Sequence, residues 1–332
     1  MAPKEYKFLT QDQVDSFMKY GYLRIPSAFS KEKASAWTAQ MWPRLGYSPT
    51  DKSTWLQDRV HMPNHTREHV STFAPKAWGA MGELLGGNID PNSGHWSDGF
   101  IVNLGTEEWV RNPPAPADLD NWHVDGDFFV HFLDSPEQGL LVIPIFSDIE
   151  KSGGGTMITP DGISVIARRL MEHPEGVSPR MVPVGEDPEY MGLGWFINKV
   201  RTECKDFHEM TGMVGDVVLM HPLMLHSASR NSLRVPRVIT NPLISAKEPF
   251  NFDRENPEDY SLVERKTLQS LGVERLKGWK ITGERAVVVP DRLRVHAAMK
   301  EAEEKRLRGE LVGGTNVTGS VIHEVLQRTA KA

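Results

Sequence analysis

The stretch "NWHVDGDFFVHF", residues 121–132, places two histidines and two aspartates in a run that otherwise reads as a β-strand. Alternate residues of a strand share a face, so His123, Asp125 and Asp127 are expected to point the same way. An H-x-D pair can hold a metal ion from one edge, and a site of two histidines and one carboxylate needs one more histidine. The alternative is that these residues form a polar, solvated strand face without a metal. For Asp127 and His131 two interpretations remain open: they orient the metal ligands, or they lie at the surface.

A second stretch, "GDVVLMHPLMLHSASRNSLRVPR" (residues 215–237), offers that histidine. His226 is favoured, whereas His221 is expected to lie at a strand end as a hydrogen-bonded polar residue. Arg237 follows His226 after a loop and a return strand, which could bring it beside the metal. A planar guanidinium binds a carboxylate through two hydrogen bonds, so a buried Arg237 favours an anionic ligand.

The remaining pattern predicts a mainly β chain with flanking helices. Short β-rich runs, each bounded by Gly, Pro or Asp, favour a sandwich or jelly roll over a parallel sheet; they are residues 99–104, 121–132, 139–146, 155–159, 215–220 and 237–244. Helices are expected after the caps Thr10 and Ser30, over 163–174, between Asn256 and Gly272, and from Pro290 to about Gly309. We therefore expect a β domain over residues 1–250 and a helical extension over 251–332, packed on or near it.

Four stretches, in order, resemble the phytanoyl-CoA dioxygenase family of Fe(II)/2-oxoglutarate oxygenases and together span roughly residues 8 to 245. They are "LTQDQVDSFMKYGYLRIPSAFS" (9–30), "WHVDGD" (122–127), "EKSGGGTMITPDGIS" (150–164) and residues 215–237. The resemblance implies a double-stranded β-helix (a cupin-like jelly roll) that uses Fe(II), 2-oxoglutarate and O₂. It also implies that His123, Asp125 and His226 bind iron, that Arg237 holds the far carboxylate of 2-oxoglutarate, and that Asn103 contacts this cosubstrate.

The sequence departs from the family pattern in two places. Where a serine often follows the distal histidine by two positions and helps to bind 2-oxoglutarate, this chain has Ala228, and Ser227 or Ser229 would have to substitute. The usual Pro-Gly-Ser-His is replaced by residues 160–164. A catalytically degenerate jelly-roll binding protein and a zinc hydrolase with the same ligands therefore remain as alternatives, although a hydrolase would leave Arg237 without a role.

The composition of the chain limits the kinds of partner that it is expected to bind. The chain has 332 residues, 39% of them hydrophobic, and 38 Lys and Arg against 44 Asp and Glu give a net charge of −6. This balance argues against a nucleic-acid surface. With a single cysteine, Cys204, and with no signal-like or membrane-spanning stretch, an intracellular and cytoplasmic protein is expected. We expect a monomer or homodimer.

The substrate is expected to be a small, largely apolar metabolite. A proline-rich loop leads into residues 121–132 and contains Trp109, Arg111 and Trp122, which could shape a substrate pocket; a surface loop with buried indoles is the alternative. Hydroxylation, desaturation or a related oxidation of a C–H bond, in secondary metabolism, is the reaction class that the resemblance implies.

Overall fold

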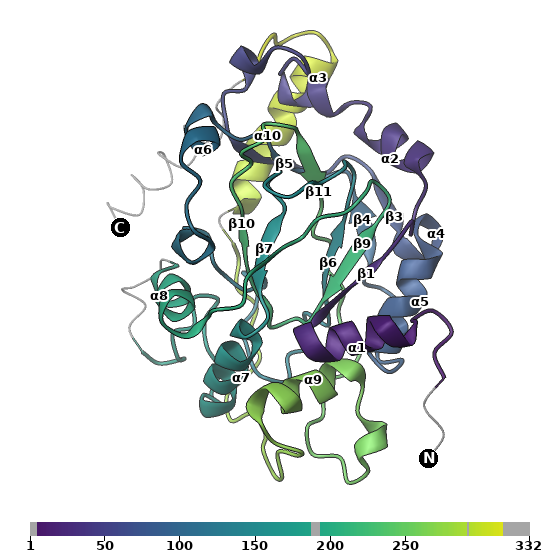
Figure 1. Cartoon of the computed structure of the whole chain (residues 1–332), viewed down its shortest axis with the longest axis vertical. Helices are drawn as coiled ribbons and strands as arrows, with labels where there is room; N and C mark the ends of the chain where they lie inside the picture. Colours follow the sequence, from purple (N-terminus) through teal and green to yellow (C-terminus); the bar gives the residue numbers. More distant parts are fainter. Residues whose placement is uncertain (1–4, 187–192, 291, 315–332) are drawn as a thin grey trace.

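The computed structural model describes residues 5–186, 193–290 and 292–314. Within these ranges the strands form three 3-stranded antiparallel sheets and one two-stranded ladder, with helices around them (Figure 1). Helices contain more residues than strands, so the chain is mixed rather than mainly β as predicted. The physical reason is that Gly, Pro and polar turn residues interrupt each β-rich run and leave strands of only two to four residues.

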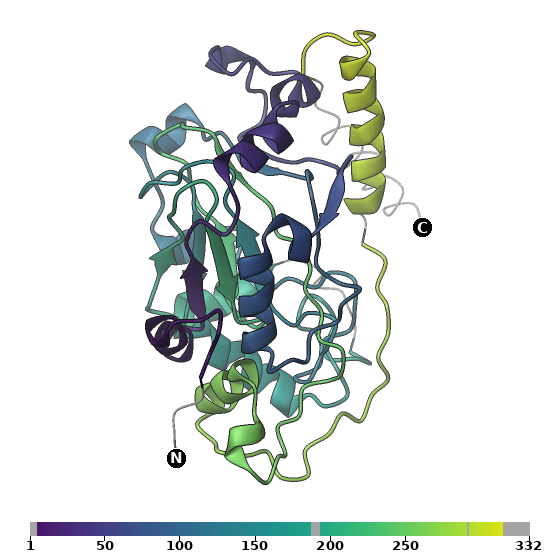
Figure 2. The same cartoon turned by 90° about the vertical axis from the view of Figure 1, so that its right-hand side faces the viewer.

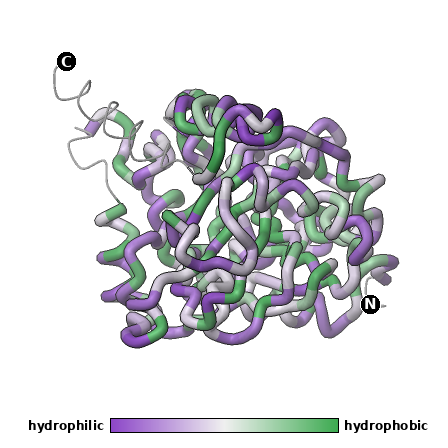
Figure 3. Tube along the Cα trace, turned by 90° about the horizontal axis from the view of Figure 1, so that it is seen from above, coloured by the Kyte–Doolittle hydropathy of each residue, from purple (hydrophilic) through white to green (hydrophobic). Residues whose placement is uncertain are grey.

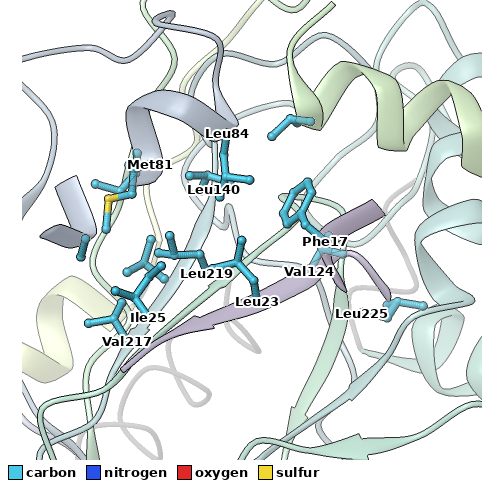
Figure 4. Packing of buried hydrophobic residues seen from close by; sticks show 14 of the residues in the cluster. Phe17, Leu23, Ile25, Met81, Leu84, Val124, Leu140, Val217, Leu219 and Leu225 are labelled. Atoms are coloured by element: carbon cyan, nitrogen blue, oxygen red, sulfur yellow. The ribbon is translucent and has the colours of Figure 1, made fainter. Parts of the chain in front are cut away.

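The first sheet carries much of the core. Its central strand β9 (Val217–Met220) pairs with β1 (Tyr22–Ile25) on one side and β6 (Leu141–Pro144) on the other. Every residue of β6 and β9 is buried, which matches their uninterrupted apolar sequence. Figure 4 shows the side chains that fill the space between this sheet and helix α5 (Pro75–Leu84); the labelled ones there include Leu23, Ile25, Met81, Leu84, Val217 and Leu219.

Two further sheets and a short ladder complete the β structure. The second sheet has the order β10 (Leu225–Ala228), β7 (Thr156–Thr159), β8 (His208–Glu209). The third has the order β11 (Arg237–Ile239), β5 (Ile101–Asn103), β2 (Arg59–His61), and β3 (Arg67–His69) pairs with β4 (His95–Ser97). Strand β10 was not predicted, although it contains the distal histidine.

Residues 121–132 do not form the predicted regular strand. In place of a strand, this segment makes isolated antiparallel bridges, including one between His123 and His226 and one between Phe129 and Val287. Gly126 has φ 113°, a backbone conformation that favours glycine, and it turns the chain directly after Asp125. The alternation expected for residues 123, 125 and 127 is therefore broken at Gly126.

Some helices begin at the capping residues that the sequence predicts. Helix α1 (Gln11–Tyr20) starts with a capping box at Thr10 and ends at Gly21, whose φ is 75°. The helix expected after Ser30 is instead two helices. The other helices in this part of the chain are α2 (Lys31–Thr38), α3 (Met41–Leu45), α4 (Val70–Phe73), α6 (Glu107–Arg111), α7 (Gly162–Glu172) and α8 (Gly194–Glu203), with short 3₁₀ turns η1 (Lys52–Thr54) and η2 (Pro116–Asp118).

The C-terminal region packs onto the rest of the chain. After the 3₁₀ turn η3 (Pro257–Asp259), helix α9 (Leu262–Leu271) starts at a Ser261 capping box and ends at Gly272. An extended segment, residues 273–290, then runs along the molecule to α10 (Arg292–Leu307), as Figure 2 shows. We call this segment the strap. The division into domains at residue 250 stays a prediction, and residues 315–332 of the expected extension lie outside the described ranges.

The distribution of hydropathy agrees with this packing. Hydrophobic stretches run through the interior of the Cα trace in Figure 3. Among the described residues, no helix combines the length and the apolar character that crossing a membrane requires.

Candidate metal centre and cosubstrate site

His123 and His226 face each other in an antiparallel bridge, and each backbone amide donates to the carbonyl of the other at 3.0 Å. Each ring is oriented by a local hydrogen bond: His123 Nδ1 lies 2.7 Å from the Asn121 carbonyl and His226 Nδ1 lies 3.0 Å from the Met224 carbonyl. A carbonyl only accepts, so both Nδ1 atoms carry the proton. The Nε2 atom of each ring is therefore the one that is available to bind a metal.

Asp125 completes the group. Its Oδ1 lies 3.5 Å from His123 Nε2 and 3.6 Å from His226 Nε2. One ligand atom from each of the three side chains lies within 4.8 Å of the others. Burial raises the pKa of the Asp125 carboxyl, but the two imidazoles more than offset this and hold its pKa well below the usual range. Burial lowers the pKa of His226, but the Asp125 carboxylate more than offsets this and raises it. Two imidazoles and one carboxylate are the donor types of a non-haem Fe(II) centre.

The residues beside these ligands anchor the site. Val124 and Leu225, which alternate with the ligands, are buried in the core cluster shown in Figure 4. His131 Nε2 donates to the Gly126 carbonyl at 2.7 Å and so supports the turn that follows Asp125. The ligand positions are therefore set by packing and by backbone hydrogen bonds, before any metal binds.

His221 does not join this group. It is fully buried at the end of β9, where its Nε2 lies 2.9 Å from Thr267 Oγ1 and its Nδ1 accepts from the Leu223 amide at 3.2 Å. Burial lowers the pKa of His221 to about 3. Both ring nitrogens are occupied, which leaves His226 as the histidine that meets the H-x-D pair.

Arg237 is a buried cation without a carboxylate partner among the described residues. It is 1% exposed, and it donates from Nε to the Gly154 carbonyl at 2.7 Å and from Nη1 to the Ile101 carbonyl at 3.1 Å. Burial, with a smaller contribution from Arg59, lowers the pKa of Arg237 to about 9. A buried guanidinium with remaining donor capacity fits the carboxylate of an anionic ligand.

Asn103, on β5, lies directly opposite Arg237 of the neighbouring strand β11. Its amide is used within the protein, because Nδ2 donates to the Ser229 carbonyl at 2.9 Å and Oδ1 accepts from the Gly105 amide at 3.2 Å. Ser227 Oγ donates to a backbone carbonyl, whereas Ser229 Oγ is buried without a partner among the described residues. Of the two serines, Ser229 has the free hydroxyl. Contact of Asn103 with a cosubstrate stays a prediction.

The three residues expected to contact a substrate differ in their exposure. Trp122 is fully buried and donates from Nε1 to the Pro116 carbonyl at 3.1 Å. Arg111 is exposed, and Trp109 stacks under Arg230, whose Cζ lies 4.4 Å from the ring centroid. Contact of these three residues with a substrate stays a prediction.

A pocket opens at Asp125, between the turn after the ligand pair and α9. Six of its lining residues are apolar and six are polar: Phe129, Phe132, Leu133, Pro222, Leu223 and Phe250, then Asp125, His131, Ser135, Gln138, His221 and Thr267. Sequence reasoning missed Arg59, which the register of β2, β5 and β11 places in one row with Asn103 and Arg237.

Comparisons with known proteins were made by sequence and by structure. No family model matches the sequence, and no curated protein matches it. Among solved structures, the chain is similar to the non-haem alpha-ketoglutarate-dependent carbocyclase SnoK from nogalamycin biosynthesis (17% identity, 87% of this chain and 100% of that one, TM-score 0.43). It is also similar to HygX from Streptomyces hygroscopicus with nickel, 2-oxoglutarate and hygromycin B bound (12% identity, 74% of this chain and 90% of that one, TM-score 0.41).

A third solved structure with this kind of similarity is EctD from S. alaskensis with 2-oxoglutarate and 5-hydroxyectoine (13% identity, 74% of this chain and 79% of that one, TM-score 0.41). The assignment of a site rests on the side chains described above and not on these distant similarities. The chain resembles the Fe(II)/2-oxoglutarate oxygenases in the sequence motifs that contain His123, Asp125, His226 and Arg237.

Proposed function

We propose that this protein is an Fe(II)/2-oxoglutarate-dependent dioxygenase that oxidises a C–H bond of a small, largely apolar metabolite of secondary metabolism. The observation that carries the proposal is the group of His123, Asp125 and His226. Each histidine ring is oriented through Nδ1, and one ligand atom of each residue lies within 4.8 Å of the others. The small antiparallel sheets would correspond to a double-stranded β-helix whose strands are shortened by turns.

Each residue has a role in this proposal. His123, Asp125 and His226 would hold Fe(II) on one face and leave its other positions open. Arg237 would bind the far carboxylate of 2-oxoglutarate, with Ser229 Oγ in place of the serine that Ala228 replaces. When bound, iron and 2-oxoglutarate supply the oxidising chemistry, in which 2-oxoglutarate and O₂ give succinate and CO₂. The buried surroundings of Arg237 would exclude water from the cosubstrate.

The experiment that tests this proposal is incubation of the protein with Fe(II), 2-oxoglutarate and O₂, with succinate measured. We expect succinate from the wild type and none from Asp125→Ala, while His95→Ala, a change at an exposed histidine, should retain it. Binding of 2-oxoglutarate without any succinate would favour the catalytically degenerate binding protein. Hydrolytic activity with Zn²⁺ that does not depend on 2-oxoglutarate would favour the hydrolase.

A further inference from the structure

Helix α10 has a polar inward face. Arg292, His296, Met299 and Glu303 follow one another at spacings of four, three and four residues, so they lie on one side of the helix. Met299 and Glu303 are buried, so this side faces the body of the protein. A packed helix normally buries an apolar stripe, whereas three of these four residues are polar. Each of the three therefore needs a partner or has another use.

Two of the three polar residues are paired. Glu303 accepts from Arg44 Nε at 2.9 Å. Arg292 donates to both carboxylate oxygens of Asp127, which follows the proposed iron ligand Asp125 by two positions. The first contact holds the C-terminal half of α10, and the second holds its N-terminal end beside the candidate metal centre.

His296 is the polar residue of this face that remains. Its ring packs edge-on against the ring of His61 in β2, with the centroids 4.7 Å apart. Neither ring forms a hydrogen bond with another described residue. His61 is exposed and His296 is half-buried, so solvent reaches both side chains. Their ring nitrogens are thus available to a ligand from outside the chain.

His61 shares a face of the third sheet with Arg237, the proposed partner of the cosubstrate. The register places Arg59, Asn103 and Arg237 in one row across β2, β5 and β11. Residues two apart in a strand point to the same side, so His61 lies on the side to which Arg59 points. In the proposed function, that side of the sheet carries 2-oxoglutarate.

His61 also lies close to the metal ligands. The carboxylates of Asp125 and Asp127 both act on the pKa of His61, in the direction that raises it. The side chains of His123 and Asp125 are 26% and 21% exposed, so solvent reaches part of the candidate metal centre. A molecule that contacts these ligands from solvent therefore has His61 within its reach.

Both imidazoles are neutral near pH 7. The protein packed around His61 removes enough water to lower its pKa to about 4, and His296 and Arg292 act in the same direction. The loss of water also lowers the pKa of His296. Arg292, the cation that acts on both rings, is neutralised by Asp127. Each neutral ring offers one N–H donor and one acceptor nitrogen, so the pair suits uncharged hydroxyl groups better than ions.

We propose that His61 and His296 are substrate-positioning residues, and that together they bind two neighbouring hydroxyl groups of a neutral, otherwise apolar substrate at the solvent-accessible side of the metal centre. This inference rests on the proposed function, because it treats His123, Asp125 and His226 as the site of reaction. It names a chemical class of substrate and gives the C-terminal helix α10 a part in recognising it.

Two probes that differ by one hydroxyl group test the proposal: cis-1,2-cyclohexanediol and cyclohexanol. Their Kd values for the protein with Mn²⁺ and 2-oxoglutarate are measured by ligand-observed NMR. The ratio of the two values is compared between proteins, so that the different hydration of the probes cancels. In His61→Phe, which keeps an aromatic ring without its nitrogens, the ratio should shift against the diol by about fivefold, the effect of one neutral hydrogen bond. An unchanged ratio, or no binding of either probe at its solubility limit, would overturn the proposal.

Matched variants assign the effect to the pair. His296→Phe should shift the ratio as His61→Phe does, and His95→Phe, at an exposed histidine of β4, should keep the wild-type ratio. His61→Gln should recover most of the preference for the diol, because an amide also offers a donor and an acceptor. A purely structural role of the ring contact predicts the reverse order, with Phe tolerated better than Gln, and that order would contradict the proposal.

A readout on the wild type serves if either Phe variant does not fold. In protein with ¹⁵N-labelled histidine, the ring-nitrogen signals of His61 and His296 are assigned through their Gln variants. These signals must shift more with the diol than with cyclohexanol. Equal shifts with both probes would overturn the proposal.

Mn²⁺ and succinate separate this inference from the proposed function. Mn²⁺ bound at the metal centre should broaden the proton signals of the bound diol, and sharp signals in a protein that binds Mn²⁺ would overturn the inference. A diol preference that depends on His61, in a protein that forms no succinate, would leave the hydroxyl site in place and defeat the oxygenase. Succinate formation without that preference would defeat the hydroxyl site alone.

Discussion

His123 and His226, which come from distant parts of the chain, form one hydrogen-bonded antiparallel pair in which each backbone amide donates to the other residue's carbonyl at 3.0 Å. The ring centroids lie 4.2 Å apart as a result. Two ligands are thus brought together by main-chain pairing, and Asp125 needs only the turn at Gly126 to join them. Rigid backbone of this kind favours a preorganised metal site.

The first prediction concerns this pair. His226→Ala should weaken the binding of Mn²⁺ by about 100-fold or more, since even residues that merely orient a ligand contribute 10- to 100-fold. Calorimetry with the metal-free protein measures the effect. The matched control His95→Ala should bind Mn²⁺ as the wild type does, and an unchanged affinity in His226→Ala would mean that the ion binds elsewhere.

The second prediction concerns Arg237. A buried charge-assisted hydrogen bond contributes about 2–3 kcal/mol, so Arg237→Ala should raise the Kd for 2-oxoglutarate by roughly 30- to 150-fold. Arg237→Lys should restore only part of the affinity, because an ammonium lacks the planar fork. Calorimetry with the Mn²⁺-loaded protein measures this. Arg294→Ala, at an exposed position of α10, serves as the control, and wild-type affinity in Arg237→Ala would exclude the carboxylate role.

The third prediction concerns the strap. Arg292 donates to both carboxylate oxygens of Asp127 at 2.6 and 2.8 Å, and next to this pair the Val130 amide donates to the Ala286 carbonyl at 2.9 Å. Because the side chains are 42% and 40% exposed, Arg292→Ala should cost less than about 1 kcal/mol of global stability. Local opening should increase nonetheless, and hydrogen exchange at the Val130 amide should become faster than in Arg294→Ala. Unchanged exchange would show that the ion pair does not hold the strap.

The fourth prediction concerns acid stability. Burial lowers the pKa of His221 to about 3. Below pH 6.5 the His221 ring is therefore protonated in the unfolded chain but stays neutral in the folded chain. The folded state therefore loses stability as the pH falls from about 6.5 towards 3, by about 1.4 kcal/mol per pH unit for this one group. Urea unfolding at several pH values should show a shallower slope for His221→Gln than for the wild type. His95→Gln should keep the wild-type slope; equal slopes in all three proteins would contradict the assignment.

Local features of the fold could be predicted from the sequence. The Thr10 cap, the Gly21 stop and the Gly272 stop depend on a few neighbouring residues, and all three occur. The strand expected over residues 121–132 does not, because its geometry depends on the turn at Gly126 and on the strap, whose partner residues come more than a hundred positions later. Strand β10 was missed because "LHSA" has little β character and pairs through distant segments.

The candidate site, like the fold, could be predicted only in part from the sequence. The spacing of His123 and Asp125 and the order of the motifs singled out the residues that the structure brings together. Trp122 was expected either to shape a substrate pocket or to be a buried indole, and in the structure its ring is fully buried and donates to the Pro116 carbonyl.

The strap also bears on how the protein matures in the cell. Ribosomal synthesis delivers the N-terminal residues first, so the ligand pair of His123 and Asp125 emerges well before Ala286, Val288 and Arg292, which bond to the segment after it. Until those later residues have been synthesised, the segment around Phe128 lacks its backbone partner. The turn beside the candidate metal centre can therefore reach its final contacts only late in the synthesis of the chain.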